Sequence, residues 1–150
     1  MLKFVQKKLK EEKGLTLIEL LAVIVILAII AAIAIPAIGN IIQNSREDAV
    51  VSDAQNILAA ANIYFAENGD VDQVEVGDPE ASDTDNAGTL IGEGYLETKG
   101  EIDNATVANV ANGANTITFT ATAGSRDVTV ENPVTAGQLS DEGRDLLIDQ

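Results

Sequence analysis

The chain opens with a continuous apolar segment that follows a short basic one. Residues 20–35 are sixteen apolar residues in a row; five lysines precede them and one basic residue, Arg46, follows closely. A helix of about 20 apolar residues spans the roughly 30 Å hydrocarbon core of a bilayer. Because positive charge is retained on the cytoplasmic side, the pattern predicts a single-pass anchor with its N-terminus in the cytoplasm and the rest of the chain outside.

After Pro36 the apolar positions recur at steps of three and four, as one face of a helix requires. These positions include Ile38, Ile41, Ile42, Val50, Ala54, Ile57, Leu58, Ala61, Tyr64 and Phe65. The pattern predicts one helix from residue 15 to about 66, about 78 Å long at 1.5 Å per residue, ended by Asn68-Gly69. Pro36 removes a backbone donor and Gly39 adds backbone freedom, so we expect a kink there.

The pattern changes again beyond residue 66. Residues 67–94 are predicted to form an acidic surface loop. A short apolar cluster at 90–96 is predicted to pack against the long helix. Alternating and β-branched residues at 105–111, 116–123 and 127–130 predict strands in a β region, 105–134, that Asn132-Pro133 ends. Within the C-terminal segment, 135–150, residues 140–142 are predicted to cap a short helix that reaches Ile148. The predicted class is α+β, with one long N-terminal helix packed on a small antiparallel sheet in a single domain, 37–150.

Composition excludes several kinds of function. The 150 residues include no His and no Cys, which removes the side chain most used for acid-base chemistry near neutral pH and the most reactive nucleophile. We therefore expect no catalytic residues and no enzyme. The 24 acidic residues outnumber the 9 basic ones, for a net charge of -15. This excess argues against direct nucleic-acid binding, which needs clustered Lys or Arg.

One acidic stretch partly matches a calcium-binding loop. Residues 83–88 place oxygen-bearing side chains at alternate positions, with Gly88 sixth. The match fails at the twelfth position, where a bidentate Glu is needed and Gly94 stands. We expect no cofactor and no metal site, and keep Asp83 and Asp85 as weak candidates for Ca²⁺.

A short motif at the start of the apolar segment carries the most specific signal. The run Lys13-Gly14-Leu15-Thr16-Leu17-Ile18-Glu19, followed by apolar residues interrupted at Pro36, resembles the N-terminal signature of type IV pilins and pseudopilins. The resemblance covers about the first third of the chain. It implies a pilin fold, cleavage of a leader, residues 1–14, after Gly14, and methylation of the new amino terminus at Leu15 by the prepilin peptidase. It also implies that the stretch around Pro36 and Gly39 can extend when subunits pack.

Glu19 places a carboxylate at the rim of the predicted membrane segment, 15–36. Insertion of a charged carboxylate at the middle of a membrane costs roughly 2.5–3.5 kcal/mol, so an acid next to this segment needs an explanation. Cleavage would create a positive amine at Leu15, four residues away on the same helix face. Pairing within one chain is one reading. In the other, favoured by the resemblance, Glu19 pairs with the amine of an adjacent subunit and so fixes the register of assembly, because other registers leave both charges unpaired.

These features predict a structural subunit that polymerises with itself into a type IV pilus. The resemblance implies as partners the prepilin peptidase, a pilus assembly platform and ATPase machinery, with the precursor in the cytoplasmic membrane and the filament outside the cell. One alternative is a pseudopilin of a type II secretion or competence DNA-uptake apparatus. Another is a membrane-anchored extracellular binding module. An ordinary signal peptide cut near Ala32-Ile33-Ala34 explains the lysines and the apolar run, but gives no role to Glu19.

Overall fold

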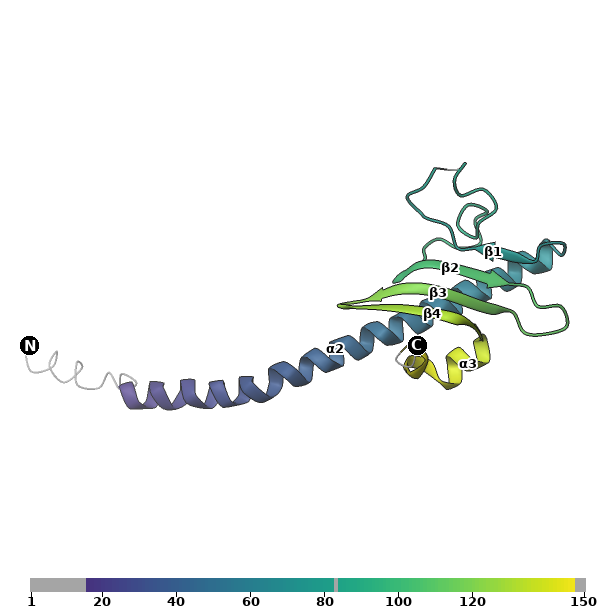
Figure 1. Cartoon of the computed structure of the whole chain (residues 1–150). Coiled ribbons are helices and arrows are strands. Elements are labelled where there is room, and N and C mark those ends of the chain that lie inside the picture. The colour runs from purple at the N-terminus through teal and green to yellow at the C-terminus, as the bar shows by residue number, and fades with distance from the viewer. Residues whose placement is uncertain (1–15, 83, 148–150) are drawn as a thin grey trace, which may run out of the picture. The chain divides into compact units, whose positions relative to one another are not determined.

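The computed structural model describes residues 16–82 and 84–147. By contacts between backbone positions, the chain divides into two compact units, Met1–Asn40 and Ile41–Gln150. One helix, α2 (Leu17–Glu67), contributes to both units (Figure 1). Its end at Glu67 lies one residue from the end that the sequence pattern predicts, and Asn68 caps it by donating from Nδ2 to the Tyr64 carbonyl at 3.0 Å.

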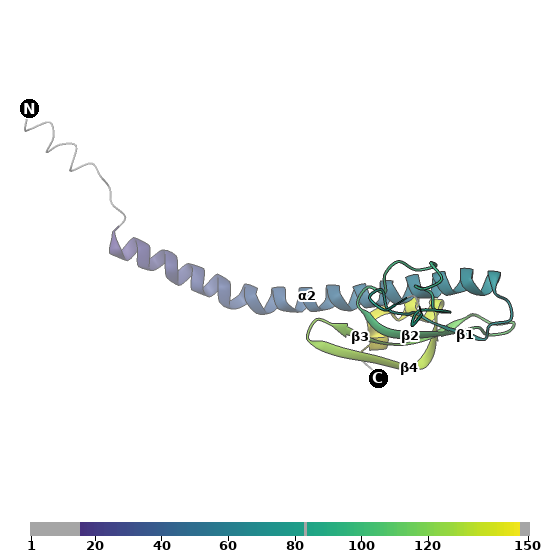
Figure 2. The ribbon, with the colours of Figure 1, turned by 90° about the horizontal axis from the view of Figure 1, so that it is seen from above.

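A four-stranded antiparallel sheet in the order β1-β2-β3-β4 forms the second unit together with the C-terminal part of α2. The strands are β1 (Gln73–Glu75), β2 (Ile102–Ala108), β3 (Thr116–Ala123) and β4 (Arg126–Thr135). This part of the helix lies across one face of the sheet (Figures 1 and 2). The arrangement confirms the predicted α+β class and is consistent with the type IV pilin fold.

The core lies between the helix and the inner face of the sheet. Every second residue of β3 points into it, so that Ile117, Phe119, Ala121 and Ala123 are buried while the threonines between them are not. This alternation confirms the strand predicted at 116–123. On the helix, burial begins at Glu47 and continues from Val50 to Phe65 at helical spacing. Ile38, Ile41 and Ile42 extend the same sequence pattern but are exposed, so the part of that face that packs on the sheet is shorter than predicted.

Two predicted boundaries in the C-terminal part were wrong. Asn132-Pro133 does not end the sheet, because β4 runs on to Thr135; three residues, 131–133, lie opposite Thr118 in a bulge that accommodates the proline. The short helix does not start at Ser140. Helix α3 (Ala136–Asp141) is capped by Thr135 and Gln138 in a capping box, and a 3-10 helix, η1 (Gly143–Leu147), follows.

The acidic segment after α2 is more ordered than its composition suggests. It contributes strand β1, whose Val74 pairs with Val107 of β2. Leu90 is fully buried in the core, and Tyr95 packs edge-on against Tyr64 of the helix with ring centroids 5.2 Å apart, as predicted for this cluster. Asn86 fixes the loop by accepting a hydrogen bond from the Asp78 backbone N–H at 2.8 Å through its side-chain oxygen.

Candidate functional site: the start of helix α2

Helix α2 begins with a reciprocal set of hydrogen bonds between Thr16 and Glu19. The Glu19 carboxylate accepts from the backbone N–H of Thr16 and from its hydroxyl, both at 2.8 Å. The Thr16 hydroxyl in turn accepts from the backbone N–H of Glu19 at 3.3 Å. This is a capping box, in which two backbone donors that have no partner inside the helix are satisfied by side chains.

This role of Glu19 was not among the predictions from the sequence. A Ser or Thr followed three residues later by an acidic residue, just before an apolar run, is the signature of a capping box, and Thr16-Leu17-Ile18-Glu19 fits it. The carboxylate thus has a partner within its own chain. Both bonds from Thr16 end on Oε2, and no described residue donates to Oε1. One oxygen of Glu19 therefore remains available to a further donor.

Gly14 and Leu15 lie outside the described residues, so the predicted cleavage and methylation stay predictions. The capping box involves only atoms from Thr16 onward. A cut after Gly14 leaves the Leu15–Thr16 peptide bond intact, and with it the backbone N–H of Thr16. Processing at the predicted bond is therefore compatible with the helix start seen here.

The helix that follows exposes its apolar side chains. All Leu, Ile and Val residues from Leu17 to Ile42 are between 47% and 88% exposed, and the most apolar 18-residue window of α2 has a mean hydropathy of 3.2 with none of it buried. Among the described residues nothing covers this surface. By length and composition this helix can cross a membrane, which together with the N-terminal motif supports a membrane anchor.

Pro36 and Gly39 both lie inside α2, and the helix is assigned without interruption across them. A Cβ added at Gly39 would meet nothing within 4 Å, so packing within this chain does not require glycine there. The expected kink and the expected extension on packing stay predictions.

A polar cluster that the sequence did not indicate joins α2 to the turn between β3 and β4. Glu47 is only 3% exposed, and its Oε1 accepts from Nη1 of Arg126 at 3.1 Å and from Nε2 of Gln43 at 3.0 Å. Gln43 also donates to the carbonyl of Ala123 at 2.9 Å. Because this buried acid has a cation and an amide as partners, the cluster is a structural clasp between helix and hairpin.

The weak calcium candidates remain untested. Asp83 lies outside the described residues, and the Asp85 carboxylate accepts from the hydroxyl of Ser82 at 2.7 Å. Within residues 16–82 and 84–147, no group of three or more acidic side chains is placed to hold a metal ion.

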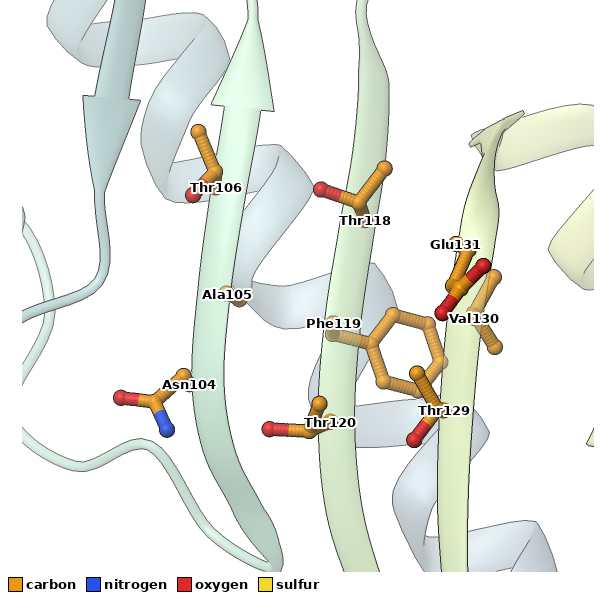
Figure 3. A pocket seen from close by; sticks show the side chains of 9 residues that line it. All are labelled: Asn104, Ala105, Thr106, Thr118, Phe119, Thr120, Thr129, Val130 and Glu131. Atoms are coloured by element: carbon orange, nitrogen blue, oxygen red, sulfur yellow. The ribbon is translucent and has the colours of Figure 1, made fainter.

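A shallow groove of about 380 Å³ crosses the sheet on the face opposite α2 (Figure 3). The side chains of Asn104, Thr106, Thr118, Thr120 and Thr129 stand on the near side of the strands, whereas Phe119 points to the helix behind them. Four threonines therefore line this groove, with the Glu131 carboxylate at one side.

Comparison with known proteins identifies one part of the chain. Residues 9–35 match the model of the prokaryotic N-terminal methylation motif. Neither a curated protein nor a solved structure shows a significant match to the chain. The matched residues include Gly14, Leu15 and Glu19, and they run through the exposed apolar helix to the residue before Pro36. The chain therefore has at its N-terminus the signature that type IV pilins and pseudopilins share, followed by a long helix packed on an antiparallel sheet.

Proposed function

We propose that the chain is a structural subunit that polymerises into a type IV pilus filament after its leader is removed. The observation that carries the proposal is the apolar surface of α2 from Leu17 to Ile35, which no described residue covers. Near the start of this surface, the capping box holds the Glu19 carboxylate in a fixed position. In the membrane, lipid covers this surface. In a filament, the same surface on neighbouring subunits covers it. The apolar surface is therefore shielded from water both before and after a subunit moves from the membrane into the filament.

In this proposal Glu19 has two partners at once. Thr16 holds the carboxylate through Oε2, and Oε1 receives the amino terminus that cleavage creates on an adjacent subunit. The capping box fixes the orientation of the carboxylate before the neighbour arrives, which reduces the side-chain entropy lost on pairing. Any other register leaves a positive amine without a counter-charge in apolar surroundings, so the pairing sets the axial offset between subunits.

The Glu19→Gln variant separates the negative charge of Glu19 from its role in capping the helix. The amide oxygen of the substituted side chain can still accept both bonds from Thr16, so the helix start is kept while the negative charge is lost. We expect cells that make this variant to process and retain the protein in the membrane but to show few or no surface filaments, counted by electron microscopy of sheared preparations. The mass of the mature chain, measured in parallel, shows whether the cut after Gly14 occurred.

Thr16→Val is the matched control, because it removes the capping hydroxyl and keeps the charge. We expect it to leave filaments largely intact. If Glu19→Gln subunits assembled as well as the native ones while Thr16→Val subunits did not, then the capping box and not the charge would be the assembly determinant, and the pairing proposed here would be wrong.

A pseudopilin role is the second candidate, since the methylation motif matches that group equally well. The two roles differ in filament length. Long filaments on the surface of cells that express the chain at its native level support the pilus subunit, and short assemblies confined to the cell envelope support the pseudopilin. A monomeric binding module would tolerate Glu19→Gln without any change in surface display.

A further inference from the structure

A single tripeptide on the outer face of the sheet has the pattern of an N-glycosylation acceptor. Of the eleven asparagines in the chain, only Asn104 is followed two residues later by Ser or Thr, in Asn104-Ala105-Thr106. The pattern Asn-x-Ser/Thr, with x other than Pro, is the acceptor for N-linked sugars in exported proteins. Such a tripeptide also occurs by chance, so its placement in the fold decides whether it can carry a sugar.

The fold exposes Asn104, leaves Thr106 half-buried and buries Ala105 between them. Asn104 and Thr106 lie two apart on β2 and stand on the face opposite α2, while Ala105 is buried between them against the helix (Figure 3). The strand has a register shift between Ile102 and Asn104, so Asp103 and Asn104 are both exposed. A group attached to the Asn104 side chain would therefore project away from the core.

The amide of Asn104 has no role in holding the fold. Other asparagines of the domain use theirs: Asn109 donates to the Val71 carbonyl at 3.0 Å and Asn115 to Asn62 at 2.7 Å. No hydrogen bond joins the Asn104 side chain to any other described residue, and Figure 3 shows it pointing away from its cross-strand partner, Thr120. Modifying this nitrogen would thus break no contact.

The surroundings of Asn104 suit a sugar. The threonine-lined groove of about 380 Å³ begins at Asn104 and crosses β3 to Thr129 and Glu131. A second hollow, of about 300 Å³, adjoins it on the β1 side and shares Asn104 and Thr106. Sugars offer many hydroxyl groups that both donate and accept, and threonine hydroxyls and a carboxylate complement them. Cross-strand pairing places Thr118 beside Thr106 and Thr120 beside Asn104.

We propose that Asn104 carries an N-linked glycan whose first sugars lie along this groove. The donor is a sugar activated as a glycosyl diphosphate. A bond forms between the Asn104 Nδ2 and C1 of the sugar, the bond between C1 and the diphosphate oxygen breaks, the diphosphate leaves with the electron pair, and the amide nitrogen gives up one proton. The step requires that the domain be exported in a cell that has a transferase for this donor, and it does not depend on filament assembly.

Transfer precedes formation of the sheet in this proposal. In the folded domain β2 is paired with β3 along its length, and the Ala105 carbonyl accepts from the Val76 backbone N–H at 3.0 Å. The backbone around the acceptor is therefore engaged once folding is complete. The finished fold then keeps the modified side chain in the open, next to the groove.

The test is the intact mass of the mature protein isolated from the cells that naturally make it. We expect a mass above that of the polypeptide by an integral set of sugar residues, located at Asn104 by peptide fragmentation. Asn104→Gln and Thr106→Ala should both lose the added mass, and Thr106→Ser should keep it because serine also completes the acceptor. Asn132→Gln, which changes an exposed asparagine outside any such tripeptide, should have no effect on the added mass.

Several outcomes would overturn the inference. A native protein with the bare polypeptide mass would do so, as would added sugar that survives Asn104→Gln and maps to a hydroxyl group. Far-UV circular dichroism of each variant shows whether loss of mass merely follows loss of folding. Because mass and filament formation are measured separately, native protein that is glycosylated but forms no filaments contradicts the filament proposal alone.

Discussion

Tyr95 shows how one side chain joins the acidic loop to the end of helix α2. Its ring packs on Tyr64, and its hydroxyl donates a hydrogen bond to the carboxylate of Glu67, the last residue of the helix. The hydrogen bond to Glu67 raises the pKa of Tyr95 above its ordinary value of about 10, and desolvation and the charge of Glu67 act in the same direction.

The raised pKa of Tyr95 makes the stability of this contact depend on pH in the alkaline range. Because the folded-state pKa exceeds the unfolded one, the contact contributes fully below about pH 10 and is lost as the pH rises through the folded pKa. In an ultraviolet titration of the folded chain, which has two tyrosines, we expect a late ionisation that disappears in Tyr95→Phe and moves back toward pH 10 in Glu67→Gln. An unchanged titration in Glu67→Gln would show that the carboxylate is not the cause.

At the scale of elements, the clasp formed by Gln43, Glu47 and Arg126 marks where α2 meets the sheet. Its acid is buried, while the side chain of Arg126 is about half exposed at 49%. We expect Glu47→Ala to lower the free energy of unfolding by about 1–3 kcal/mol, because Gln43 and Arg126 then lose their shared acceptor. The measurement is urea unfolding of the full chain in detergent, followed by the near-ultraviolet circular dichroism of its tyrosines.

Asp48→Ala is the control for the clasp. Asp48 pairs with Arg144 at 3.2 Å, but both side chains are exposed, so its loss should cost about 0–1 kcal/mol. Equal effects of the two substitutions would mean that burial adds nothing to the Glu47 interaction.

The elements differ in how well the sequence predicts them. Helix α2 and strand β3 follow directly from their periods of 3.6 and 2, because each has one buried face along its packed part. Strand β1 lies in an acidic stretch, and only its pairing with β2 defines it. Strand β4 passes through Pro133 because a bulge at the sheet edge removes the need for that N–H. The prediction that the sheet ends at Pro133 considered only the local effect of proline, whereas the pairing of β4 with β3 decides where the strand ends.

The residues of the candidate site also differ in how well the sequence predicts them. The N-terminal motif and Glu19 are local in sequence and were found there, and the capping box was available from the same four residues. The Glu47 clasp and the threonine-lined groove bring together residues from separate elements, such as Glu47 with Arg126 and Asn104 with Thr129. No sequence period links such positions, so only the fold identifies them.

At the scale of the whole molecule, acidic side chains greatly outnumber basic ones in the part of the chain beyond the apolar helix. The predicted leader, residues 1–14, contains five of the nine basic residues and two of the 24 acids, so its removal would leave 22 acids and four basic residues, a net charge of 4 - 22 = -18. Like charges keep such domains apart in solution.

This repulsion predicts that association depends on pH. We expect light scattering by the full chain in neutral detergent to rise as the pH falls from about 7 toward about 4, where carboxylates begin to take up protons. Added salt near neutral pH should raise the scattering less, because it screens the charge without removing it. Scattering that stays flat down to about pH 3, below the ordinary carboxylate pKa, would show that charge repulsion is not what keeps the chains dispersed.

The bulge and Pro133 in β4 affect whether the sheets of neighbouring copies can pair edge to edge. Strand β4 is an edge of the sheet, and an open edge invites pairing with the strand of another molecule. Pro133 offers no N–H to an incoming strand, the three-residue bulge interrupts the even spacing that such a strand would need, and the opposite edge, β1, is only three residues long. Even when many copies are held at high density, this sheet resists the strand-to-strand fusion that leads to amyloid.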